Sequence, residues 1–256
     1  MTSKVLTGLV RKGLPSIVTV AVIIFLYKTY GAWEYTVENL PEFFKLTYEH
    51  LLLVLITMCF SISIGVTLGT VMTREGWEKI SPVIMAVVNV WQSIPSLGVI
   101  ALAYGLLPLL GLSGIGMVPS LIAIFMFSVA PVVRNTYAGI ESVSEDIKEA
   151  ATGMGMTSRQ ILFQIELPNA LPIIMGGIRT STALVVGTAP LAFLIGGGGL
   201  GFWIFTGIAL VDMGIMTAGA VPVAIIAMLF DFLLEIAEKM VVSRGVQADE
   251  AQLAAL

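Results

Sequence analysis

The sequence predicts an all-α polytopic membrane protein with about six transmembrane helices. Of its 256 residues, 57% are hydrophobic, and the mean hydropathy is +0.97. Only 12% of the residues are charged, whereas about 25% are charged in an average soluble domain. The lipid bilayer is therefore the expected surrounding of this chain. The net charge of −4 and the lack of a basic patch argue against a nucleic-acid partner.

A helix needs about 20 apolar residues to cross the hydrocarbon core of a bilayer. Stretches of this kind lie at 14–30, 51–73, 81–107, 117–140, 171–195 and 215–242. Arg11 and Lys12 precede the first stretch, and because no small-x-small cleavage site follows it, we expect a retained anchor helix. The chain then divides into an anchor helix with an acidic outer connector (1–50), a membrane core (51–242) and a tail (243–256).

The basic residues predict the orientation of these spans. If both termini are cytoplasmic, the outer side keeps only Lys28 and Lys45. The cytoplasmic side then holds Lys4, Arg11, Lys12, Arg74, Lys79, Arg134, Lys148, Arg159, Lys239 and Arg244. Because cytoplasmic loops of membrane proteins carry the excess of lysine and arginine, this topology is favoured, and it places the polar segment 141–168 in the cytoplasm.

The connector at 33–50 is acidic, and we expect it to form a short surface helix on the outer side. Its carboxylates belong to Glu34, Glu38, Glu42 and Glu49. His50, the only histidine of the chain, is expected to be solvated at this interface.

Two spans are interrupted. Ser93-Ile94-Pro95-Ser96 breaks the third span, because Pro95 removes a helical hydrogen bond. Broken helices are tolerated in a bilayer where they line a cavity or are covered by protein. The glycine-rich segment 196–201, which includes Gly198, ends the fifth span as either a tight turn or a flexible element.

Small and charged residues inside the spans carry two further predictions. Ser61, Gly65 and Gly69 recur at every fourth position, which predicts close packing of two helices. Arg179 lies deep in the fifth span, where a charge is costly and should face a partner or a watery pathway. Its candidate partners are Asp231 and Glu235 on the last span, although snorkelling toward the cytoplasm explains all three charges as well.

The segment 141–168 is the long polar stretch inside this apolar sequence, and it predicts two short helices joined by a glycine turn. Ser142 with Glu145, and Thr157 with Gln160, have the spacing of capping boxes at the two helix starts. Ile147, Ala150, Ala151 and Met154 share a face of the first helix, which Gly153 and Gly155 end. Pro168 is expected to stop the second helix.

The spacing Glu149-Ala150-Ala151, three residues, Gly155, nine residues, Ile165-x-Leu167-Pro168 resembles the EAA loop of permease subunits in binding-protein-dependent ABC importers. The resemblance implies a type I ABC importer permease fold in a prokaryotic cell membrane. It implies that the loop docks on an ATPase subunit through Glu149, Ala150, Ala151 and Gly155, flanked by Met154 and Met156. The implied partners are two ATPase subunits, an extracytoplasmic binding protein and a second permease copy.

The chain has no G-x-x-x-x-G-K-[ST] segment, so it lacks the phosphate-cradling loop of an ATPase. It also offers no Cys/His metal cluster and no nucleophile–base pair. We therefore expect no catalytic residue, no metal and no cofactor in this chain, with ATP-Mg bound by the partner ATPase. On this reading the acidic outer connector is either a solvated loop or a docking surface for the binding protein.

Further segments narrow the resemblance to permeases for osmoprotectants, which import glycine betaine, choline, carnitine and related quaternary-ammonium solutes. These are 93–96, 131–137, 154–157, 166–172, 177–180 and 194–201. Pro190 and Gly197 depart from the pattern. Because methylated ammonium groups bind aromatic faces, Trp91 and Tyr104 beside the broken third span are candidates for the translocation pathway. The other candidates come from the broken third span and the fifth span, and they are Ser93, Pro95, Arg179 and Gly198.

Two alternatives remain open at this point. A permease of the same superfamily could carry a sulfonate, nitrate or an amino acid, because the EAA loop is common to all of them. An ion-coupled secondary transporter is a different class, and it would need a buried ionisable relay that this sequence barely offers.

Overall fold

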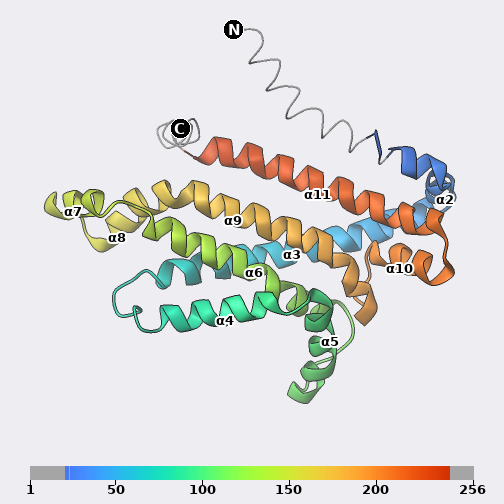
Figure 1. Ribbon diagram of the computed structural model, residues 1–256, viewed down its shortest axis with the longest axis horizontal. Helices are drawn as coiled ribbons and strands as arrows, with labels where there is room; N and C mark the ends of the chain where they lie inside the picture. The colour runs from blue at the N-terminus through green and yellow to red at the C-terminus, as the bar shows by residue number, and fades with distance from the viewer. Residues whose placement is uncertain (1–20, 23, 243–256) are drawn as a thin grey trace, which may run out of the picture.

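The computed structural model describes residues 21–22 and 24–242, and every regular element in that part of the chain is a helix. Figure 1 shows long helices side by side along the longest axis, with the hairpin of α7 and α8 projecting at one end. We call this the hairpin end, and we call the end that carries α2 and α10 the opposite end. The prediction of an all-α fold is confirmed.

The elements follow one another as α2 (Ala32–Glu38), α3 (Leu40–Val71), α4 (Ser81–Ser93), α5 (Ser96–Leu106), η1 (Leu107–Leu110), α6 (Met117–Glu141), α7 (Glu145–Gly153), α8 (Ser158–Ile161), η2 (Leu162–Glu166), α9 (Leu167–Thr188), η3 (Ala189–Ile195), α10 (Gly201–Leu210) and α11 (Met213–Val241). Of these, η1 and η3 are 3₁₀ helices, and η2 is a π-helical turn.

Four helical stretches are long and apolar enough to cross a membrane: Leu40–Val71, Met117–Glu141, Ser158–Ile195 and Met213–Val241. The stretches Ser81–Ser93 and Ser96–Leu110 give a fifth span if they are counted as one, although they meet at 102°. Five of the predicted spans therefore have counterparts in the structure. Of the predicted anchor helix at 14–30, residues 21–22 and 24–29 are helical, and residues 14–20 and 23 lie outside the described residues, as does the whole tail at 243–256.

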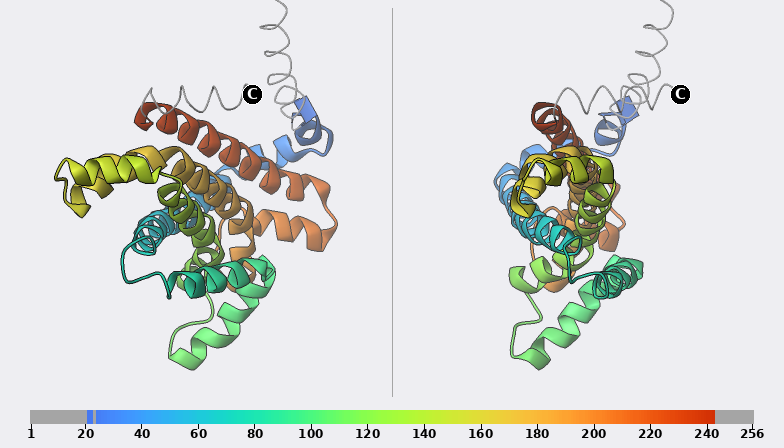
Figure 2. Two further views of the ribbon diagram at one scale, coloured as in Figure 1. Left: turned by 60° about the vertical axis from the view of Figure 1, so that its left-hand side comes forward. Right: turned by 90° about the vertical axis from the view of Figure 1, so that its left-hand side faces the viewer.

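The break in the third span is sharper than an interruption within one straight helix. Ile94 takes an extended conformation between α4 and α5, and Pro95 stands at the start of α5, where its missing N–H is tolerated. Figures 1 and 2 show α5 turning away from the other helices.

The core lies where α3, α6 and α9 pack against one another. A Cβ on Gly65 would lie 2.7 Å from Val132, and one on Gly69 would lie 2.6 Å from the Cβ of Thr136. Such distances leave no room for a side chain, so α3 and α6 touch backbone to side chain, as the small-residue spacing predicts. Ser61 and Ser128 add a hydrogen bond of 2.7 Å between their hydroxyls in the same contact.

The opposite end contains an element that the sequence did not predict, the apolar helix α10. Its Trp203 is fully buried and donates from Nε1 to Glu42 at 2.9 Å, and the rings of Tyr35 and Phe43 pack against the indole. α10 has ten residues, which are too few to cross a bilayer. It packs against α11 and covers the bundle at this end.

The glycine-rich segment 196–201 is packed against α3. Glu49 Oε2 accepts a hydrogen bond from the Gly199 amide at 2.9 Å, and positive φ angles at Gly196, Gly198 and Gly199 shape the turn. His50 is fully buried beneath Gly199, and neither ring nitrogen has a hydrogen-bond partner among the described residues. The prediction of a solvated His50 is therefore wrong. α3 begins at Leu40, so His50 lies within the helix and under the glycine segment.

Candidate functional site

The hairpin of α7 and α8 carries the candidate site, and its helix starts test the two predicted capping boxes. Thr157 and Gln160 form a capping box, with the Gln160 side chain accepting from the Thr157 amide at 2.8 Å. The box predicted for Ser142 and Glu145 is wrong, because α7 begins two residues later, at Glu145, with Ser144 at its N-cap. The Ser142 hydroxyl instead donates to the Gly139 carbonyl at the end of α6.

The predicted end of the first helix is confirmed. α7 ends at Gly153, and Gly155 has a φ of 81°, the left-handed conformation that favours glycine. Beyond Gly155 the backbone turns sharply into α8, and this turn sets the shape of the hairpin tip.

The predicted docking residues divide into one buried and several accessible positions. Ala151 is the buried residue of α7, with 1% of its surface exposed. Glu149, Ala150 and Gly155 are exposed, and Met156 is half-buried. The predicted apolar face is therefore only partly covered by this chain.

Two large apolar side chains of the hairpin have no cover. Met154 is 75% exposed and Ile147 is 45% exposed, and they lie seven residues apart, on one face of α7 and its C-cap. Lys148 pairs with Glu145 at 2.9 Å, whereas Glu149 makes no ion pair among the described residues. The hairpin thus presents a small uncovered apolar patch on one face of α7, and Glu149, two residues beyond Ile147, lies on a different face of the same helix.

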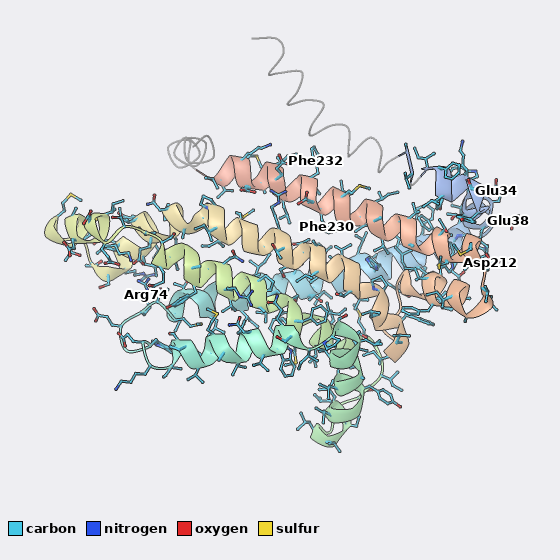
Figure 3. The ribbon with its side chains drawn as sticks, viewed as in Figure 1. Glu34, Glu38, Arg74, Asp212, Phe230 and Phe232 are labelled. Carbon is cyan, nitrogen blue, oxygen red and sulfur yellow. The ribbon has the colours of Figure 1, made fainter. Side chains whose placement is uncertain are left out.

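The second hairpin helix does not stop at Pro168, so that prediction is wrong. It continues through the π turn Leu162–Glu166 into α9, where Pro168 occupies the first turn. Proline is tolerated there because the amides of a first helical turn need no partner within the helix. Glu166, which sequence reasoning did not select, forms an ion pair of 2.6 Å with Arg74. Arg74 lies in the turn after α3 and is labelled in Figure 3.

Arg179 forms the predicted contact with the last helix. Its guanidinium lies 2.8 Å from Asp231 and 3.1 Å from Glu238, so α9 and α11 are joined by an ion triad. Glu235, the other predicted partner, pairs with Lys239 instead. Asp231 and Glu238 are seven residues apart, about two turns along one face of α11, so both carboxylates reach the same guanidinium.

The remaining pathway candidates lie in regions of the structure away from Arg179. Trp91, Ser93 and Pro95 gather at the bend between α4 and α5, and Trp91 Nε1 is buried with no partner among the described residues. Tyr104 lies on α5 and lines a hollow of about 240 Å³ between α5 and η3. Gly198 is at the opposite end, against Glu49. The structure thus places the candidates in three separate regions, and their role on a pathway stays a prediction.

The profile of the family described as "Binding-protein-dependent transport system inner membrane component" matches residues 65–244. The chain belongs to this family. It is 42% identical over 209 residues to the "Choline transport system permease protein OpuBB" of Bacillus subtilis, covering 82% of this chain and 93% of the relative. The "Glycine betaine/carnitine/choline transport system permease protein OpuCB" of the same organism matches with the same identity and coverage.

A solved structure with the same fold is the MetNI methionine ABC transporter in inward-facing conformations. It superposes with a TM-score of 0.68 at 22% identity, covering 77% of this chain and 94% of the other. The chain is therefore a multi-pass permease subunit of a bacterial ABC importer and is not itself catalytic. Membership of a binding-protein-dependent system also implies an ATPase and a binding protein as its partners.

Proposed function

We propose that this permease imports an osmoprotectant of the quaternary-ammonium class, such as glycine betaine, choline or carnitine, by alternating access driven by a separate ATPase. The observation that carries the proposal is the 42% identity to two permeases whose names state these solutes, over 82% of the chain. The candidate residues in the spans do not choose among the three solutes.

The ATPase binds the surface of the hairpin that is formed by Glu149, Ala150, Met154 and Gly155. The exposed methionine and the unpaired carboxylate of the hairpin support this assignment. ATP must favour one conformation of the spans through a difference in contacts between the two states. The hairpin is the described cytoplasmic element best placed to make them. Two ATPase subunits act on two permease chains, the second being identical or homologous to this one.

The two ends of the molecule fit the two sides of a membrane. Arg74, Lys79, Lys148 and Arg159 lie at the hairpin end, which favours a cytoplasmic position for that end and for both termini. At the opposite end Glu34 and Glu38 are exposed on α2 (Figure 3). Glu42 and Glu49 instead bind groups of this chain. The docking surface for a binding protein is thus centred on α2.

The test is uptake of labelled glycine betaine by vesicles that hold this chain with its ATPase and binding protein. We expect unlabelled choline and carnitine to compete, and taurine and nitrate to leave uptake unchanged. Stimulation of ATP hydrolysis by the binding protein without betaine uptake would refute the cargo and leave the permease role intact.

A further inference from the structure

The ion pair of Arg74 and Glu166 joins two segments that are 92 residues apart in the sequence. Arg74 lies in the turn that follows α3, and its amide donates to the Val71 carbonyl at the end of that helix. Glu166 is the last residue of the π turn between α8 and α9. The pair therefore links the end of one span to the point where the hairpin enters another.

The geometry of this pair is closely fixed. Arg74 Nη2 lies 2.6 Å from Glu166 Oε2, and its Nε and Nη2 also donate to Thr73 Oγ1 at 3.1 and 2.7 Å. The Glu166 side chain is only 7% exposed, so its carboxylate has lost most of its contact with water. Loss of Arg74 would leave this charge largely buried without its partner, which is why such a pair is costly to break.

The rest of the hairpin is weakly attached to the spans. Ala151 is the buried residue of α7, and α8 has no buried residue. The covalent connection on the α9 side runs through the π turn, a helical irregularity that frequently marks functional sites. A hairpin held mainly at its two ends takes its angle from the contacts at those ends, and the Arg74–Glu166 pair is the charged contact there.

We propose that Arg74 and Glu166 are positioning residues, which hold the hairpin at a fixed angle so that its movement is passed to α3 as well as to α9. The inference rests on the proposed role of the hairpin as the ATPase-docking element. α3 continues without a break from Val71 to Leu40, and its Glu49 binds Gly199 at the opposite end. Displacement of α3 at the hairpin end therefore reaches the glycine-rich segment.

The test measures solute imported per ATP hydrolysed in vesicles with the ATPase and binding protein. For Arg74→Gln and Glu166→Gln we expect this ratio to fall several-fold, because the ATPase still hydrolyses ATP while the hairpin no longer passes its movement to α3. Arg74→Lys, which keeps the charge, should give an intermediate ratio. The exchange variant with Arg74→Glu and Glu166→Arg should recover much of the wild-type ratio. Glu75→Gln, at an exposed neighbouring position, is the matched control and should leave it unchanged.

A purely structural role would lower uptake and ATP hydrolysis together and leave the ratio at the wild-type value, and this result would overturn the inference. Where a glutamine variant fails to insert, the lysine and exchange variants decide the question by the same ratio. If the wild-type complex shows no ATP-dependent uptake of glycine betaine, the proposed cargo fails instead. The ratio is then measured with whichever solute the wild type imports.

Discussion

The exposed methionine at the tip of the hairpin gives the sharpest prediction for ATPase docking. Met154 is 75% exposed in this chain, and the proposed contact would remove its side chain from water. Full burial of a methionine side chain contributes about 1.5–3 kcal/mol, so the exposed three-quarters corresponds to about 1–2 kcal/mol. Since about 1.4 kcal/mol is a factor of ten in affinity, Met154→Ala should weaken ATPase binding about 5- to 30-fold.

The assay is titration of the purified ATPase subunit onto the permease in nanodiscs, read as a dissociation constant. The chain supplies a matched control in Met240, which is 76% exposed near the end of α11 and lies outside the hairpin. Met240→Ala removes the same atoms from a side chain of the same exposure, and the affinity should not change. Equal affinities of the two variants would refute the docking surface.

Three further predictions concern the hairpin, the core and the glycine segment. Gly155→Pro should abolish ATP-driven uptake and leave membrane insertion intact, because proline cannot adopt the positive φ of this turn; the readouts are transport and the amount of inserted protein. Gly69→Ala should destabilise the fold by about 1–3 kcal/mol through overpacking, whereas Gly176→Ala, with no atom within 4 Å of the new Cβ, should not; thermal unfolding in detergent compares them. Glu49→Ala should speed amide exchange in residues 196–201 about tenfold or more, because a charged hydrogen bond contributes about 1.5–3 kcal/mol; unchanged exchange would mean that the bond does not hold the segment.

Local patterns in the sequence predicted the elements that depend on local physics. The apolar lengths located the spans, the small-residue spacing located the contact of α3 with α6, and Thr157 with Gln160 marked the start of α8. The Glu-Ala-Ala spacing located the hairpin. Each of these signals acts over a few residues or one helix face, so it is readable without knowledge of the tertiary fold.

Two failures concern the ends of helices, and two contacts that were not predicted arise where distant segments meet. Ser142 has the spacing of a cap, but the α6 helix runs on and its hydroxyl bonds back to Gly139. A proline after an apolar stripe predicts a helix end, but Pro168 lies in the first turn of α9, where proline is compatible with a helix that enters through a π turn. No signal in the sequence paired Arg74 with Glu166, or Glu49 with Gly199, because each pair forms only when separate helices pack.

The burial of His50 also depends on the tertiary fold and not on its neighbours in the sequence. In the sequence it stands next to Glu49 at the edge of an apolar stretch, which is typical of a solvated residue. The structure covers it with the glycine segment, which approaches because Gly199 has no side chain to hold it away from the His50 backbone. A run of glycines near a lone polar residue was the one available hint.

Solute uptake by reconstituted vesicles with and without the ATPase subunit, under ATP and under an imposed proton or sodium gradient, distinguishes an ATP-driven permease from an ion-coupled transporter. We expect uptake of glycine betaine only when the ATPase, ATP and the binding protein are all present, with no response to either gradient. Gradient-driven uptake by this chain without its ATPase would contradict the account and show an ion-coupled transporter.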